Sequence, residues 1–213
     1  VSNIVGAVYS QYKFTSLPEF NAALKQFNVV ADRGKEEGRI FKNRGLVYRI
    51  LDSAGNKVGV PIKASSIGCK PILANLEKKF TANETAKEFL KSFVKIKLDD
   101  CLSQSPSTVK ELTEQLKQKN IYTVLRQNAE GRLYGITFVD NQNKVVFNGS
   151  DLGKGYSAAA LQSKLASGTE KSLSNDETKG GRSSGSIQKE MSQQKQHAKT
   201  MPLTTKTESP LDV

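Results

Sequence analysis

The sequence predicts an α+β protein made of two tandem αβββα-like modules joined by a helix, with a disordered C-terminal tail. Three observations lead to this fold class. One pattern of residue types occurs twice in the same order, in residues 15–80 and in residues 107–165, although few residues are identical. In each copy, apolar residues at helical spacing are followed by strand-like runs around a turn. After Gly168, large apolar side chains become too scarce to offset the entropy of folding.

The same changes in pattern predict the boundaries of five segments. These are an N-terminal helix that ends an upstream element (1–14), a first α/β module (15–80), a connecting helix and linker (81–106), a second α/β module (107–167) and a polar tail (168–213). The first segment is apolar but has no basic leader, so it is expected to be an amphipathic helix rather than a signal peptide.

Each module is expected to open with a capped helix. Ser16 and Thr108 are each followed three residues later by a glutamate, Glu19 or Glu111. In such a capping box the hydroxyl accepts the glutamate amide, and the carboxylate bonds back to the amide of the capping residue. A buried stripe follows at a spacing of three to four residues in the first copy. Its predicted members are Phe20, Ala23, Leu24 and Phe27.

A hairpin is expected after the first strand of each copy. Strand-like runs cover residues 45–52 and 132–140, and the turns after them are rich in Asp, Asn and Gly. The aspartates also suggest a calcium loop. However, Ala54 and Lys63 stand where an EF-hand needs oxygen ligands, so hairpin turns are favoured.

The helix between the modules is expected to begin near Thr81. Its predicted apolar face comprises Ala86, Phe89, Leu90, Phe93, Ile96 and Cys101. Four lysines (Lys87, Lys91, Lys95 and Lys97) are expected on a solvated face, with phosphate contact as the alternative.

Charge suggests an anionic partner. The formal net charge is +11, and residues 1–100 hold 17 Lys and Arg against 10 Asp and Glu. A basic domain favours nucleic acid, although a merely basic protein is the alternative. The sequence has no apolar run long enough to span a membrane, and Cys69 and Cys101 are expected to be free thiols. The chain is therefore expected to be cytoplasmic, without membrane insertion.

Catalytic motifs are missing from the sequence. The sole histidine, His197, lies in the predicted tail, which excludes a histidine metal cluster and a Ser-His-Asp triad within this chain. The glycines do not have the spacing of a phosphate-binding loop. No catalytic residue, metal or cofactor is therefore expected in this chain.

Two sets of residues are candidates for DNA binding. The first is a glycine-punctuated loop that carries Arg33, Lys35, Arg39, Lys42 and Arg44. Such a loop can lay cations along a phosphate backbone, with Phe41 or Tyr48 stacking on a base. An ordinary exposed loop is the alternative.

The second set lies at the end of each copy and at the start of one strand. It comprises Lys63, Ser65, Ser66, Arg132, Ser150 and Lys154. The serines precede short helices, whose amides together with a lysine can bind phosphate. Helix capping is the alternative, and Ser157 is a good cap.

The repeat also resembles a known family. Residues 131–140 followed by 146–154 resemble the element downstream of the nuclease domain in relaxases, the mobilisation proteins of Bacteroidetes conjugative elements. The first copy is similar through residues 31–34, 45–48 and 58–66, so the resemblance covers about residues 1–165.

Relaxases nick one strand at the transfer origin and remain attached to it through a tyrosine, using a histidine cluster to hold a divalent metal. This chain has no such cluster, so the resemblance implies the C-terminal, post-nuclease part, and no catalytic residue is carried over. Any enzymatic activity would belong to a nuclease domain encoded upstream. The six tyrosines are expected to be core or stacking residues.

The function implied is a non-catalytic DNA-binding accessory segment that acts in plasmid or transposon conjugation. Its expected partners are single-stranded DNA or transfer-origin duplex, with relaxosome proteins as further partners. The alternative is a protein-interaction module that docks the relaxase onto relaxosome or coupling-protein partners.

Overall fold

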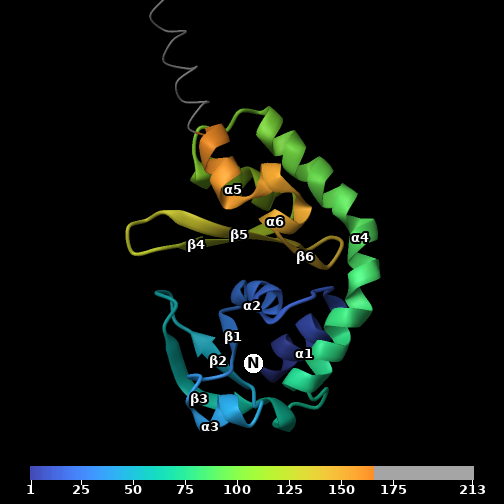
Figure 1. The fold of residues 1–213 in the computed structure, drawn as a ribbon, viewed down its shortest axis with the longest axis vertical. Coiled ribbons are helices and arrows are strands. Elements are labelled where there is room, and N and C mark those ends of the chain that lie inside the picture. Colours follow the sequence, from blue (N-terminus) through green and yellow to red (C-terminus); the bar gives the residue numbers. More distant parts are fainter. Residues whose placement is uncertain (166–213) are drawn as a thin grey trace, which may run out of the picture. The chain divides into compact units, whose positions relative to one another are not determined.

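Two three-stranded antiparallel sheets form the framework of the computed structural model, which describes residues 1–165 (Figure 1). The first sheet has the order β1 (Val29–Asp32), β2 (Val47–Leu51), β3 (Lys57–Lys63). The second has the order β4 (Ile121–Gln127), β5 (Leu133–Asp140), β6 (Val145–Asn148). The α+β prediction is confirmed, and the tail predicted over residues 168–213 lies outside the described residues.

Helices precede, connect and follow the sheets. They are α1 (Ser2–Gln11), α2 (Leu17–Lys25), α3 (Arg39–Lys42), α4 (Leu73–Ser103), α5 (Val109–Gln118) and α6 (Gly149–Leu152), with 3-10 turns η1 (Ala64–Ser66) and η2 (Lys154–Tyr156). Residues 158–165 are also helical. Within residues 1–165, none of the helices has the length and apolar content needed to cross a bilayer.

The element order of the first copy recurs in the second. The order α2-β1-β2-β3 is matched by α5-β4-β5-β6, and each sheet is a simple meander. Val47 lies opposite Lys63 in the first sheet, and Thr137 lies opposite Asn148 in the second. These registers make residues 44–50 equivalent to residues 134–140 and residues 63–65 equivalent to residues 148–150.

The capping boxes form in both copies, with one difference from the expectation. The Ser16 hydroxyl accepts a hydrogen bond from the Glu19 amide (3.3 Å), and Thr108 caps Glu111 in the same way (3.1 Å). The glutamate, however, accepts from the amide one residue before the cap: Thr15 in the first copy (2.6 Å) and Ser107 in the second. The bond to the Ser16 amide was predicted wrongly. Because both copies make this bond to the preceding residue, it is a property of the repeated motif and does not depend on a neighbouring element.

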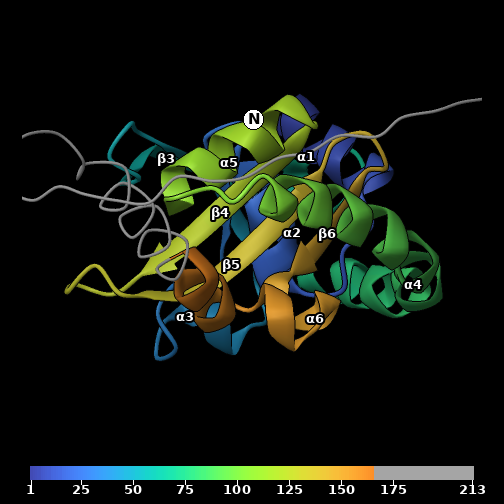
Figure 2. The same cartoon turned by 90° about the horizontal axis from the view of Figure 1, so that it is seen from above.

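Helix α2 lies between the two sheets and joins their cores (Figures 1 and 2). It contacts β1 on one side and β5 and β6 on the other. The first core cluster therefore contains side chains of both copies, among them Phe20, Tyr48 and Val139. The neighbouring Phe138 points to the second cluster, which lies against α5 and residues 158–165. The second sheet is consequently buried on both faces, whereas most residues of β3 are exposed.

Helix α4 is longer than predicted, and it buries a different side from the one predicted. It begins at Leu73 rather than near Thr81, because the segment contains no Gly or Pro that would separate a closing helix from a connecting helix. Its buried apolar residues are Leu73, Leu76, Val94, Leu98 and Cys101. Three residues of the predicted apolar face are instead exposed: Phe89 by 75%, Phe93 by 55% and Ile96 by 66%. Phe27, predicted to be buried, is also exposed.

Lys87 of α4 was expected in solvent but is buried. Its ammonium bonds both carboxylate oxygens of Glu19 (2.7 and 2.6 Å) and the Thr15 hydroxyl (3.0 Å). It also lies over the Phe147 ring of β6, 4.9 Å from the ring centroid. The pair links α4, α2 and the second sheet at one point, which explains why a lysine stem is accommodated in the interior.

Candidate nucleic-acid interface

Two pockets lie at equivalent places in the two copies. Five positions line the pocket of the first copy: Arg44, Gly45, Leu46, Lys63 and Ser65. Their five equivalents line the pocket of the second copy: Tyr134, Gly135, Ile136, Asn148 and Ser150. The sequence repeat therefore produces a repeated concavity, formed where a strand begins and the opposite strand passes into a helical turn. We call these concavities the first pocket and the second pocket.

The first pocket gathers four of the residues predicted to bind DNA. It has a volume of about 570 Å³ and is lined by Arg39, Arg44, Lys63 and Ser65 among others. None of the described residues that line it is acidic. Cations without an interleaved carboxylate favour an anionic ligand of phosphate type. On the surface next to the pocket, Arg44 pairs with Glu77 of α4 (2.6 Å), and both side chains are exposed, so the pair is weak and open to exchange.

The two arginines are brought to the pocket by a compact turn. The predicted loop contains the short helix α3, which begins at Arg39. The chain then returns through Arg44, whose φ is 52°, and the Gly45 amide donates to the Ile40 carbonyl (2.7 Å). A Cβ at Gly45 would lie 3.0 Å from that carbonyl oxygen, which is tighter than most real Cβ contacts, so this close approach favours glycine.

The remaining basic residues of the loop lie outside the first pocket. The Arg33 guanidinium lies over the Phe41 ring, 4.0 Å from its centroid, and thereby occupies one face of a predicted stacking residue. Lys35 and Lys42 do not line the pocket. Tyr48, the other predicted stacking residue, is fully buried and donates to the Pro71 carbonyl (2.7 Å), so that assignment is wrong. Burial also raises the pKa of Tyr48.

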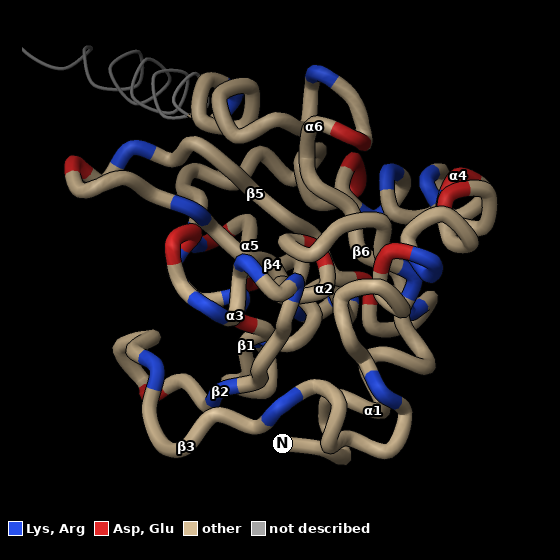
Figure 3. Tube along the Cα trace, turned by 60° about the horizontal axis from the view of Figure 1, so that its bottom comes forward, with Lys and Arg blue, Asp and Glu red and all other residues tan. Residues whose placement is uncertain are grey.

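Not all of the charge in the first copy is available to a ligand. Asp32 pairs with Lys57 (2.8 Å) and Arg49 (3.3 Å) beside the first sheet. Burial opposes the charged form of Asp32, but hydrogen bonds and the positive charges of Lys57 and Arg49 outweigh it and hold the pKa of Asp32 below its usual value. Lys and Arg also occur on α3, β2, β3 and α4, and of these elements α4 carries acidic residues as well (Figure 3). What distinguishes Arg39, Arg44 and Lys63 is therefore that they converge on one pocket, and not the total charge of the first copy.

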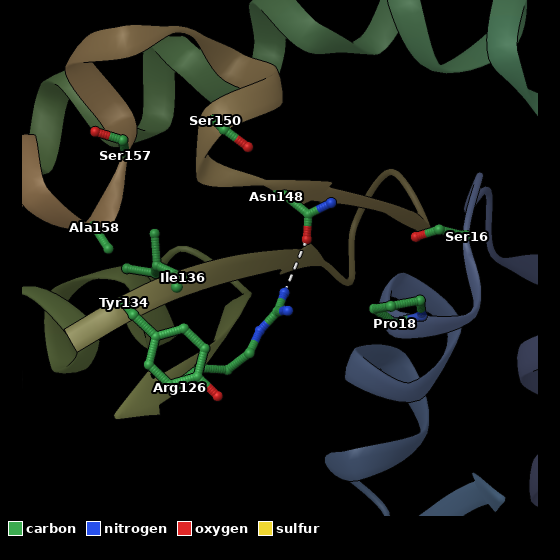
Figure 4. A pocket seen from close by; sticks show the side chains of 10 residues that line it. Ser16, Pro18, Arg126, Tyr134, Ile136, Asn148, Ser150, Ser157 and Ala158 are labelled. Carbon is green, nitrogen blue, oxygen red and sulfur yellow. Dashed lines mark hydrogen bonds between the residues drawn. The ribbon is translucent and has the colours of Figure 1, made fainter. Parts of the chain in front are cut away.

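Arg126 and Tyr134 line the second pocket together with small and polar residues, and its volume is about 340 Å³ (Figure 4). Arg126 reaches from β4 and donates to the Thr137 hydroxyl (2.8 Å) and the Asn148 amide oxygen (3.1 Å). Tyr134, which is 66% exposed, stands at the position of Arg44 in the first copy. A planar guanidinium beside an exposed ring can bind phosphate and stack on a base.

Arg126 was not predicted from the sequence. It lies near the end of β4, between Leu125 and Gln127, and a cation inside a strand-like run is the sequence signal that could have identified it. Arg126 and Pro18 also line a neighbouring cavity of about 340 Å³ between α2 and both sheets, which includes Lys25 and Lys57. Arg126 thus lines both concavities, and it is the one basic residue among those described that line the second pocket.

The other predicted residues of the second copy are scattered. Ser150 lines the second pocket, whereas Lys154 lies in η2 and Arg132 next to the β4–β5 turn, and neither lines it. Ser66 lies in η1 outside the first pocket. Ser157 accepts a hydrogen bond from the Ala160 amide (3.3 Å), which confirms its capping role.

Comparison with known proteins identifies no relative. The chain matches no family model, no curated protein and no solved structure. Within residues 1–165, no group of three or more His, Cys, Asp and Glu side chains is placed to hold a metal ion. Function is therefore inferred from the two pockets.

Proposed function

We propose that this chain is a non-catalytic DNA-binding segment that holds the phosphate backbone in the first pocket, in keeping with an accessory role beside a relaxase at a transfer origin. The observation that carries the proposal is the convergence of Arg39, Arg44 and Lys63 on one concavity with no acidic lining residue among those described. Phosphate contacts of this kind supply affinity without reading sequence. Ser65 adds a hydroxyl donor at the same place.

The second pocket extends the proposal to single strands. Tyr134 offers an exposed ring beside Arg126, while the first copy has an arginine at the same position. Bases can stack on such a ring only when they are unpaired. We infer that the first copy holds phosphates and that the second favours unpaired bases.

Neutralising the first pocket should reduce the salt dependence of DNA binding. For Arg39→Gln/Arg44→Gln/Lys63→Gln, loss of three phosphate contacts should make the slope of log affinity against log salt shallower by about 2 for single strands and about 2.7 for duplex. Fluorescence anisotropy with labelled oligonucleotides across a salt series measures the slope.

The matched control is Lys70→Gln/Lys110→Gln/Lys117→Gln. It removes the same charge from exposed lysines that do not line the first pocket. Its slope should stay close to that of the unaltered chain. Equal changes in the two variants would point to diffuse charge attraction and contradict the proposal, as would an absence of binding at low salt.

Removing the Tyr134 ring should reduce the affinity for single-stranded DNA but not the affinity for duplex DNA. Tyr134→Ala should weaken binding of single strands by roughly 5- to 100-fold, since one base stack is lost, and should leave duplex affinity nearly unchanged. Tyr134→Phe keeps the ring and serves as the control in the same anisotropy assay. An equal loss for single strands and duplex would exclude the stacking role.

One observation also favours the docking alternative. Ile50, Val58 and Val60 are exposed on the first sheet, Val60 by 88%, and Ile50 pairs with Val58 across β2 and β3. A protein that uses this apolar surface would still bind the triple variant of the first pocket. Retained partner binding together with unaltered DNA affinity in that variant would favour docking over DNA binding.

A further inference from the structure

Helix α4 carries an exposed apolar stripe that the two cores do not use. We call it the α4 seam, and it consists of Ala82, Ala86, Phe89, Phe93 and Ile96. Its three large side chains are 55–75% exposed, whereas Val94 and Leu98 on the other side of the same helix are buried. Large apolar side chains grouped on an exposed helix are typical of an interaction surface.

The spacing of the seam is that of a helix-pairing surface. Its members are separated by four, three, four and three residues, the heptad period with which two helices pack along their length. At 1.5 Å per residue, the stripe from Ala82 to Ile96 is about 21 Å long. The partner that fits it is therefore another helix with the same period.

The order of side-chain sizes indicates an identical helix in antiparallel orientation. Both alanines lie on one side of Phe89, and Phe93 and Ile96 lie on the other. A two-fold axis at Phe89 places Ala82 opposite Ile96 and brings Ala86 to within one residue of the position opposite Phe93, so that large side chains meet small ones. A parallel pair would instead set alanine against alanine, leaving a gap.

Charge agrees with the same axis. Lys78 and Asp100 lie beyond the two ends of the seam, eleven residues on either side of Phe89. The two-fold axis brings the lysine of one copy to the aspartate of the other at both ends. In a parallel pair, like charges would face each other. Asp100 also pairs with Lys119 of its own chain, but its side chain is still 54% exposed.

We propose that the α4 seam docks against the α4 seam of a second copy of this chain, antiparallel, with the two-fold axis at Phe89. The interface is isologous, so each substitution acts twice in the dimer. It stands apart from the DNA-binding proposal, because none of the seam residues lines the first or the second pocket.

Sedimentation equilibrium of the full chain tests the proposal over about 10 µM to 1 mM. We expect a reversible monomer–dimer equilibrium. Phe89→Gln should raise its dissociation constant about 100-fold, since two rings are lost at the axis while helix propensity is kept. Because Phe89 is exposed in the monomer, the variant should fold normally, as circular dichroism can check. Val60→Gln removes an exposed apolar side chain elsewhere and should leave the dimer intact.

Charge reversal tests the orientation. Lys78→Glu and Asp100→Lys should each weaken the dimer through repulsion, and the double variant should restore it. A double variant that associates no better than the single ones would overturn the antiparallel arrangement. A full chain that stays monomeric throughout, or a dimer unaffected by Phe89→Gln, would overturn the proposal and leave a different protein or residues 166–213 as the occupant of the seam.

Discussion

Replacing Lys87 by Met should lower the free energy of unfolding by about 3–5 kcal/mol. The change keeps the apolar stem but leaves the Glu19 carboxylate charged and buried without its cation. Removing one partner of a buried ion pair costs this much because the remaining charge is neither solvated nor paired. Urea unfolding followed by circular dichroism gives the difference in unfolding free energy between the two proteins, provided that the slope of this free energy against urea concentration is unchanged.

The repeat itself supplies a control for this prediction. Glu111 is the equivalent of Glu19 and makes the same capping hydrogen bond, but it is exposed, and within residues 1–165 no buried lysine lies beside it. Glu111→Gln should cost less than about 1 kcal/mol. The double variant Glu19→Gln/Lys87→Met should recover more than half of the loss, because neither charge remains. If Lys87→Met costs no more than Glu111→Gln, the pair is not the link between the two cores.

Replacing Gly149 by Ala should destabilise the second copy by about 2–3 kcal/mol. A Cβ at this position would lie 2.2 Å from the Tyr156 carbonyl oxygen and 2.6 Å from a methyl carbon of Ile136. Both are closer than real Cβ contacts, and one is backbone, so α6 and η2 must move apart. The second pocket should be distorted as well, because Ile136 and Ser150 line it. Thermal or urea unfolding measures the loss.

The equivalent position in the first copy provides the comparison. It is Ala64, which is buried and tolerates its methyl group. Ala64→Gly should cost only about 0.5–1 kcal/mol, through backbone entropy. Similar losses in the two variants would show that the close approach at Gly149 does not constrain the chain. A large loss in Gly149→Ala alone would show that this approach is specific to the second copy.

Much of the candidate site could be predicted from the sequence, because its residues lie close together along the chain. Arg39 and Arg44 belong to one loop, and Lys63 and Ser65 belong to one strand end, so their types and spacing mark them as candidate phosphate ligands. Their meeting in one pocket was not visible, because it depends on β2 pairing with β3 in a particular register. Arg126 was missed for a similar reason: its role follows from the neighbouring strand that supplies Thr137.

The sequence by itself determined the repeated order of elements, the helix caps and the hairpin turns. These depend on contacts between residues a few positions apart, such as Ser16 with Glu19, or the Asp52 carboxylate with the turn amides that donate hydrogen bonds to it. Only the tertiary structure decided which side of α4 is buried. That helix carries two apolar stripes, one through Phe89 and Phe93 and one through Val94 and Leu98, and periodicity alone does not rank them. The buried side is the one on which Val94 and Leu98 pack into the second core cluster and Lys87 meets the Glu19 carboxylate, and both partners come from segments distant in the sequence.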